Sequence, residues 1–207
     1  MGPGHDRDSQ AELAAALIHG RRSVAPRKLH APGPDARQLH DLLLAAATAP
    51  DHGQRVPWRF VEVPAEHRAD LAEVFASALL ERDAGANEEQ LARARGKAQD
   101  APLVLLCIVD LGPQDDAIPS LERVASAGCA LQNMLLLATA QGFACALTSG
   151  RAMTSRALRA AFGLAASEQA LCFVAIGTGV DPDHHVQRPD PARFFSRFPK
   201  ARPGETT

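Results

Sequence analysis

The chain has 207 residues, of which 46% are hydrophobic, and a formal net charge of −2 at pH 7. That length suits one domain with a substantial buried core, and the near-neutral charge excludes a general attraction to nucleic acid or to anionic lipid. Apolar stretches such as "LVLLCIVDLG" are too short to span a bilayer, and the N-terminus lacks a basic-then-apolar signal pattern, so we expect a cytoplasmic protein with no membrane partner.

The first half of the chain predicts helices around one strand. A first helix is expected from Ser9, which forms a capping box with Glu12, to Gly20. A second helix is expected from about residue 35 to residue 50, because its leucines recur at helical spacing. The alternating "WRFVEV" predicts a strand, and helices are expected over residues 66–82 and 87–97.

The second half predicts three strands and a long helix. "APLVLLCIV" is apolar on both faces, which indicates a central buried strand. The long helix, from Ser120 to about Gln141, is apolar nearly all round and should be buried between layers or between subunits. "FACALT" predicts a strand, a helix with Thr154 as its N-cap ends at Gly163, and "LCFVAIGTG" predicts the final strand.

This order of about four strands separated by helices predicts an α+β or α/β fold with one sheet covered by helices on both faces. We expect a single domain over residues 1–207, with a core of about 9–180 and an extended tail of 181–207. The tail is too rich in Pro and charge to build its own core, yet Phe194, Phe195 and Phe198 imply that it packs onto something.

Each motif that could bind a ligand or take part in a reaction also has an ordinary structural interpretation. "GRRS" at residues 20–23 is either a charged helix end or an anion site. "APDHGQRVPWRF" at residues 49–60 is a helix stop and strand start with surplus polar groups, and the glycines of "LTSG" and "VAIGTG" end strands or let backbone approach a ligand. The four cysteines are expected to be buried free thiols.

No protease, kinase or zinc signature is present, and we expect no metal site. The tail does hold four potential ligands, but adjacent histidines in a Pro/Asp loop lack the usual ligand spacing. These four residues are Asp181, Asp183, His184 and His185.

Taken in order, "RRS", "APDH", "PWRF", "SAGCALQNMLLLATAQGF", "TSG" and "IGTG" resemble the nitroreductase family of FMN-dependent oxidoreductases, in particular its short, single-domain bacterial subgroup. The resemblance covers roughly residues 13–195. It implies an α/β/α sandwich with a mostly antiparallel sheet of four to five strands. It also implies a homodimer whose long helices pack at the interface, with two FMN sites shared between the subunits.

The resemblance also implies site residues. The FMN contacts carried over from the family are Arg21, Arg22, Ser23, Thr48, His52, Leu147, Thr148 and Ser149. Thr48 and His52 are expected to reach the flavin of the partner subunit. A weaker NAD(P)H region comprises Leu137, Ala138, Thr139, Ala140, Gln141 and Gly142.

The implied activity is reduction of a small electron-poor acceptor, such as a nitroaromatic or a quinone, by NAD(P)H in a ping-pong mechanism. The flavin carries this chemistry, so no catalytic protein residue is expected. Many family members read S-x-x-N-x-Q-P-W in the loop, whereas this chain has Gln54 and Val56 at the two amide positions, and Thr48 and Leu147 replace a subgroup Arg and Trp. Two alternatives stay open: a flavin-binding redox sensor or store with little turnover, and a cofactor-free dimeric interaction module.

Overall fold

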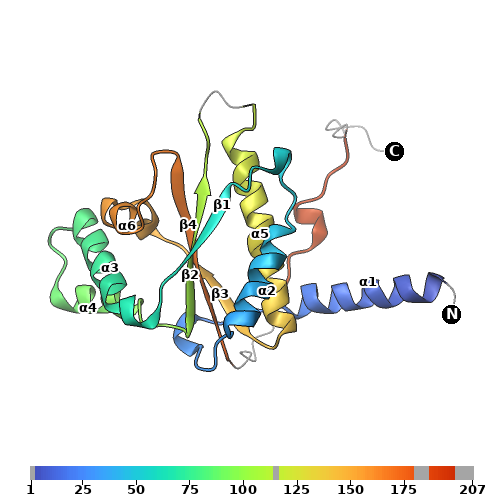
Figure 1. The fold of residues 1–207 in the computed structure, drawn as a ribbon, viewed down its shortest axis with the longest axis horizontal. Coiled ribbons are helices and arrows are strands. Elements are labelled where there is room, and N and C mark those ends of the chain that lie inside the picture. The colour runs from blue at the N-terminus through green and yellow to red at the C-terminus, as the bar shows by residue number, and fades with distance from the viewer. Residues whose placement is uncertain (1–2, 114–116, 180–186, 199–207) are drawn as a thin grey trace.

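A computed structural model describes residues 3–113, 117–179 and 187–198, with side chains from residue 8 onwards (Figure 1). The elements follow the predicted order. The helices are α1 (Pro3–Gly20), α2 (Ala36–Ala47), α3 (Arg68–Arg82), α4 (Glu88–Gly96), α5 (Ser120–Ala140) and α6 (Arg156–Ala161), and the strands are β1 (Trp58–Glu62), β2 (Leu103–Asp110), β3 (Ala144–Thr148) and β4 (Glu168–Gly177). Tail residues 181–186 and 199–207 lie outside the described residues.

The described strands form one sheet in the order β1-β2-β4-β3, and every neighbouring pair is antiparallel. β2 and β4 occupy the centre, where they are paired on both sides. β2 is fully buried from Leu103 to Val109 and β4 from Cys172 to Gly177, as their apolar sequences predicted. β1 and β3 are the two edges.

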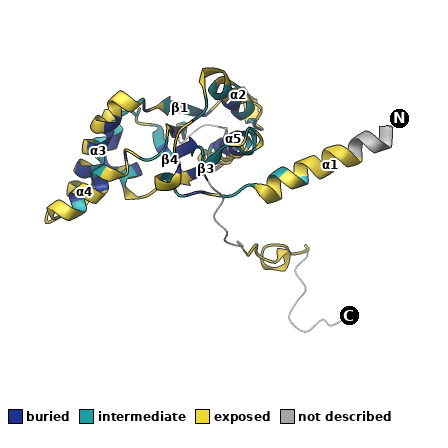
Figure 2. Cartoon of the chain, turned by 90° about the horizontal axis from the view of Figure 1, so that it is seen from below, coloured by how far each residue is buried: buried dark blue, intermediate teal, exposed yellow. Residues whose placement is uncertain are grey.

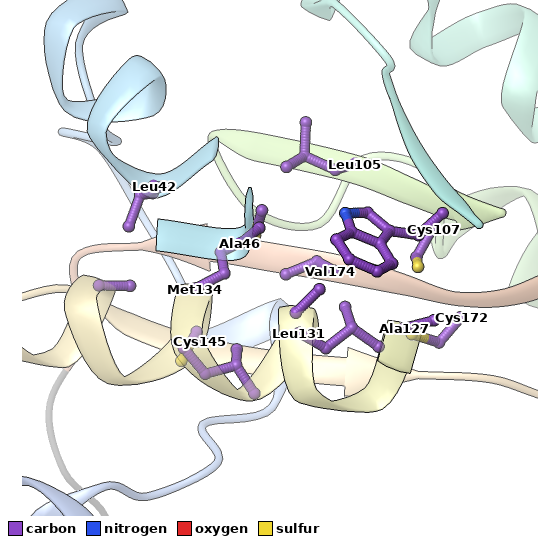
Figure 3. Packing of buried hydrophobic residues seen from close by; sticks show 14 of the residues in the cluster. Leu42, Ala46, Leu105, Cys107, Ala127, Leu131, Met134, Cys145, Cys172 and Val174 are labelled. Carbon is purple, nitrogen blue, oxygen red and sulfur yellow. The ribbon is translucent and has the colours of Figure 1, made fainter. Parts of the chain in front are cut away.

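Two helical layers cover this sheet. Successive side chains of a strand face opposite sides of the sheet, so β2 supplies two cores. Leu105 and Cys107 pack with α2 and α5, whereas Val104 and Leu106 pack with α3 and α6. Figure 1 shows α2 and α5 on one face and α3, α4 and α6 on the other, and Figure 3 shows α5 residues such as Leu131 directed at the strands. The predicted α/β/α sandwich is confirmed.

Helix α5 buries one face rather than its whole circumference. Its sheet-facing residues include Ala127 and Met134, both fully buried, whereas Leu121 and Cys129 are exposed in the single chain. The expectation that all four cysteines are buried is therefore wrong for Cys129. It holds for the other three thiols, and burial raises the pKa of Cys107 to about 12.

Helix starts follow capping chemistry, with two corrections. The Asp35 and Asn87 side chains each accept from the backbone N–H three residues later, and the Gln at that position bonds back, so α2 and α4 begin with capping boxes. Ser9 is not a cap, because α1 already begins at Pro3, a residue that fits the first turn of a helix. Ser155, rather than Thr154, caps α6.

A buried arginine ties together the segments at the lower ends of β1 and β2. The Arg68 guanidinium donates to the carbonyls of Val63, Ala98, Asp100 and Pro102 at 2.8 to 3.4 Å. Burial lowers the pKa of this guanidinium. Because four carbonyls converge on one side chain, the start of α3 and the loop before β2 hold a fixed relation to each other.

A second arginine clamps the sheet across its central strand. Arg59 of β1 forms a bidentate ion pair with Glu168 of β4, in which Nε donates to Oε1 over 2.6 Å and Nη2 donates to Oε2 over 2.9 Å. Glu168 also accepts the Ala165 amide at 2.9 Å. The hydrogen bonds from Arg59 lower the pKa of Glu168 to about 2.

We expect this ion pair to make the free energy of unfolding depend on pH in the acidic range. The folded-state pKa of Glu168 lies below its ordinary value of 4.5, so the stabilisation is present above that value and is lost as the pH falls towards 2. Glu168→Gln should lower the free energy of unfolding by about 1 to 2 kcal/mol at pH 7, because the partly exposed pair is screened by solvent. Urea unfolding at a series of pH values measures this difference.

Glu89→Gln is the control, because Glu89 pairs only at 3.7 Å with Arg93 on an exposed helix face. Its effect should be small at every pH. A Glu168→Gln deficit that stays constant between pH 7 and pH 2 would contradict the assigned ion pair.

Candidate functional site

The segment after α1 runs along the β3 edge of the sheet. Ser23 forms a parallel bridge with Cys145, and the Val24 amide donates to the Cys145 carbonyl over 3.1 Å. Because the bridge is parallel, the chain from Arg21 towards Pro26 follows β3 towards its end at Thr148. The structure thus places the predicted segments 21–23 and 147–149 on one sheet edge, although they are distant in the sequence.

The two arginines of this segment have different partners. Arg21 Nη1 donates to Ser23 Oγ over 3.3 Å, and its charge opposes the rise in pKa that burial causes at the Cys145 thiol. Arg22 Nη1 donates to the carbonyls of His19 and Arg21, next to the end of α1. Arg22 therefore complements the helix end, whereas Arg21 and Ser23 are better placed to meet an anion.

A third guanidinium reaches this place from the C-terminal tail. Arg188 Nη2 donates to the Arg21 carbonyl over 3.2 Å. Within the described residues, neither Arg21 nor Arg188 forms an ion pair with a carboxylate. Two guanidinium groups beside a hydroxyl are a donor set suited to phosphate. Sequence reasoning missed Arg188 because the Pro-rich tail has no periodicity that would place it.

A cavity of about 630 Å³ begins where β3 ends. It lies between α3 and α4 on one side and, on the other, Pro26, the end of β3, β4 and the 3₁₀ turn Arg151–Thr154. Thr148 and Ser149 line it, and Phe75 and Phe173 meet edge to face in its wall with ring centroids 5.5 Å apart. Its volume is in the usual range for small-molecule sites. Leu147 is exposed on the edge strand.

Thr48 and His52 lie elsewhere, on the α2 and α5 layer. Thr48 is the C-cap of α2, and Asn133 of α5 donates to its hydroxyl over 3.1 Å. His52 Nδ1 lies 2.8 Å from Glu122 Oε1 at the start of α5. Neither residue lines the cavity, so one chain does not bring them to Thr148 and Ser149. The expectation that they reach the flavin of a partner subunit stays a prediction.

The predicted NAD(P)H region, residues 137–142, forms the last turn of α5 and the turn into β3. Ala138 is fully buried, and the Thr139 hydroxyl is bonded to the Leu135 carbonyl over 2.8 Å. Gln141 Oε1 is buried without a hydrogen-bond partner, which makes it an available acceptor. None of the six residues lines the cavity, and their role stays a prediction.

The loop before β1 has unusual backbone geometry. Gln54 and Val56 have φ values of +52° and +45°, a region that β-branched residues rarely adopt. Asp51 holds the loop by accepting the Val56 amide over 2.6 Å. Val56 occupies one of the two amide positions at which the sequence departs from S-x-x-N-x-Q-P-W, so the altered residue is also a strained one.

The part of the chain that the structure describes contains no group of three or more His, Cys, Asp or Glu residues arranged to hold a metal. Asp181, Asp183, His184 and His185 lie outside the described residues. No described helix combines the length and apolarity needed to cross a membrane.

A family model and individual relatives of this chain indicate the same protein family. The model of the nitroreductase family matches residues 18–178. A Haemophilus influenzae protein named "Putative NAD(P)H nitroreductase" is 37% identical over 81% of this chain and 89% of its own. "Putative NAD(P)H nitroreductase YdjA" of Escherichia coli is 31% identical over 89% of this chain and 99% of its own.

A solved structure extends the likeness to the fold. The FMN-dependent nitroreductase NfnB from Mycobacterium smegmatis, in complex with NADPH, matches 91% of this chain and 100% of its own with a TM-score of 0.68. At 19% identity, this likeness concerns the fold alone.

The strained loop yields a stability prediction. Val56→Asn should raise the free energy of unfolding by about 1 kcal/mol, because Asn tolerates positive φ whereas a β-branched residue does not. Val56 is 59% exposed, so little packing is lost. Chemical denaturation measures the gain. Arg55→Asn is the matched control, since Arg55 has an ordinary φ of −79°, and an equal gain there would argue against strain at Val56.

Proposed function

The chain belongs to the nitroreductase family, as its motifs predicted, and we propose that it binds FMN and uses NAD(P)H to reduce an electron-poor acceptor. The observation that carries this proposal is the β3 edge, where the Arg21–Ser23 segment runs beside a strand that ends at a ligand-sized cavity. The names of the relatives and the FMN-dependent structural neighbour support it.

The donor set at this edge fits a flavin phosphate. Arg21, Ser23 and Arg188 supply two guanidinium groups and a hydroxyl, with no carboxylate paired to either guanidinium among the described residues. A phosphate dianion placed there would gain charge-assisted hydrogen bonds. Thr148 and Ser149, at the far end of β3, would lie against the remainder of the cofactor, next to the cavity. Arg22 would have to leave its helix-end carbonyls to join them.

Bound FMN would supply the redox chemistry, namely hydride acceptance from NAD(P)H followed by transfer of two electrons to the acceptor in a ping-pong order. For a nitroaromatic acceptor, the balanced first reduction converts NAD(P)H, a proton and Ar–NO₂ into NAD(P)⁺, Ar–NO and water. The chain's own residues bind the phosphate, and the apolar wall of Phe75 and Phe173 shields the acceptor site from water. No protein nucleophile takes part.

We further propose a homodimer. Figures 1 and 2 show α1 projecting away from the body, with most of its described residues exposed. Leu13 is 64% and Ile18 53% exposed, and Phe194 and Phe195 of the tail are also exposed. An isolated helix of this length is marginal in water, so it needs a packing partner. A second copy would cover these side chains and could bring its Thr48 and His52 layer to the flavin.

Absorbance spectroscopy tests the flavin proposal. The purified protein, or protein reconstituted with FMN, should show a bound-flavin spectrum, and anaerobic addition of NADH or NADPH should bleach it. Bleached protein should regain its colour when a nitroaromatic or a quinone is added. A spectrum without bound flavin would exclude the proposal, whereas flavin that reductant never bleaches would favour the redox sensor or store.

Arginine variants locate the phosphate site within the same assay. Arg21→Ala should weaken FMN binding by roughly 1 to 3 kcal/mol, because a charged hydrogen bond to phosphate is lost. Arg22→Ala is the matched comparison and should weaken binding less, since Arg22 is bonded to helix-end carbonyls. Equal FMN affinity for Arg21→Ala and the unmodified protein would remove this arginine from the site.

Light scattering after size exclusion tests the dimer. The protein should elute with the mass of two chains, and the double variant Leu13→Asp/Ile18→Asp should dissociate at about tenfold higher concentration or more, because two apolar contacts would be replaced by charges. Leu80→Asp, on α3 at the opposite side of the molecule (Figure 1), is the control. A monomeric parent protein, or equal dissociation of all variants, would contradict the proposed surface.

A further inference from the structure

The cavity beside β3 combines two chemical characters. Its apolar wall includes Leu71, Phe75 and Leu79 of α3 together with Phe173 of β4. The same lining contains cationic side chains from α3, from α4 and its C-cap, and from the turn after β3. These cations are Arg82, Arg93, Lys97 and Arg151. Because several separate elements converge here, the cluster is not simply the solvated face of one helix.

Few carboxylates balance these charges. Arg93 approaches Glu89 at 3.7 Å, with both side chains exposed. Arg82, Lys97 and Arg151 form no ion pair within the described part of the chain. Three positive charges on the lining are therefore available to an incoming anion.

The described lining contains one carboxylate, Asp100, against its four cationic side chains. Asp100 faces the Arg27 charge, and burial raises the pKa of its carboxyl group. Arg95 of α4 provides the contrast, since it is bonded to Glu73 at 2.8 and 3.2 Å and lies outside the lining. Lys97, the C-cap of α4, therefore lines the cavity with no ion-pair partner among the described residues, whereas the paired Arg95 lies away from it.

From this lining we propose that the cavity selects organic anions: electron acceptors that carry a carboxylate on an aromatic or quinone ring. The inference rests on the proposed reductase function and names its substrate class. The apolar wall accepts the ring, and the cations hold the carboxylate through charge-assisted hydrogen bonds. Thr148 and Ser149 belong to the same lining, so an acceptor bound here lies next to the proposed flavin.

A matched pair of ligands tests the inference by equilibrium binding. 4-Nitrobenzoate and 4-nitrobenzamide share a ring and a nitro group but differ in charge. Isothermal titration calorimetry of the purified protein, without reductant, should show the benzoate binding about fivefold to tenfold more tightly at low salt. The preference should shrink as ionic strength rises.

Variants assign the preference to the cations. Arg82→Gln/Lys97→Gln should reduce benzoate affinity about fivefold to tenfold and leave amide affinity unchanged. Arg95→Gln, two residues before Lys97 on α4, is the control and should change neither affinity. Arg151→Gln, on a different element, should show the same selective loss of benzoate affinity. This single variant replaces the double variant in the test if circular dichroism shows that the double variant is unfolded.

Three outcomes would overturn the inference: equal affinities for the two ligands, an unchanged benzoate affinity in both Arg82→Gln/Lys97→Gln and Arg151→Gln, or an equal loss in Arg95→Gln. If the cations bind the NADPH phosphate instead, these variants should raise the KM for NADPH but not for NADH and leave the preference for benzoate unchanged. That result would also overturn the inference. The flavin spectrum tests the reductase proposal separately from this inference. Protein that binds no flavin would refute the reductase proposal, even if calorimetry still showed the preference for benzoate.

Discussion

The burial of β2 and β4 on both faces is the constraint on which the rest of this structure depends. A central strand that is apolar on both sides must be covered twice, so α2 and α5 pack on one face and α3 and α6 on the other. Leu105 and Leu106 are neighbours in sequence yet belong to different cores. With the centre filled by apolar side chains, the polar groups able to bind a ligand lie at the sheet edge and at the ends of strands.

The candidate site is a consequence of that arrangement. β3 is an edge strand, and its free side receives the Arg21–Ser23 segment. The guanidinium and hydroxyl donors of this segment lie beside Cys145 and towards the start of β3, whereas the cavity begins at the other end of the strand. Arg68 gathers four carbonyls around the start of α3 and the loop before β2, and so steadies the helical wall of the cavity. The proposed phosphate site and the acceptor cavity thus lie along one edge strand, and the proposed flavin would span the distance between them.

The same arrangement divides the predicted contacts between two surfaces. Thr48 and His52 are held by Asn133 and Glu122 of α5, whereas Thr148 and Ser149 line the cavity. Helix α1 projects from the body in Figure 2, and its Leu13 and Ile18 are exposed, as are Phe194 and Phe195. In the proposed dimer, a second copy would have to supply one of these two surfaces to the flavin site of the other.

The amino-acid sequence alone predicts the order of helices and strands, the central buried strands and the family, because periodicity, caps and ordered motifs are local properties. It misjudged Ser9 and Cys129, whose surroundings depend on where a helix begins and which face it buries. Only the tertiary structure separated Arg21 from Arg22 and brought Arg188 to the same edge. Likewise, only packing could show that Arg82, Lys97 and Arg151 meet on one cavity while Arg95 turns to Glu73, because charge balance is decided by contacts between elements distant in the chain.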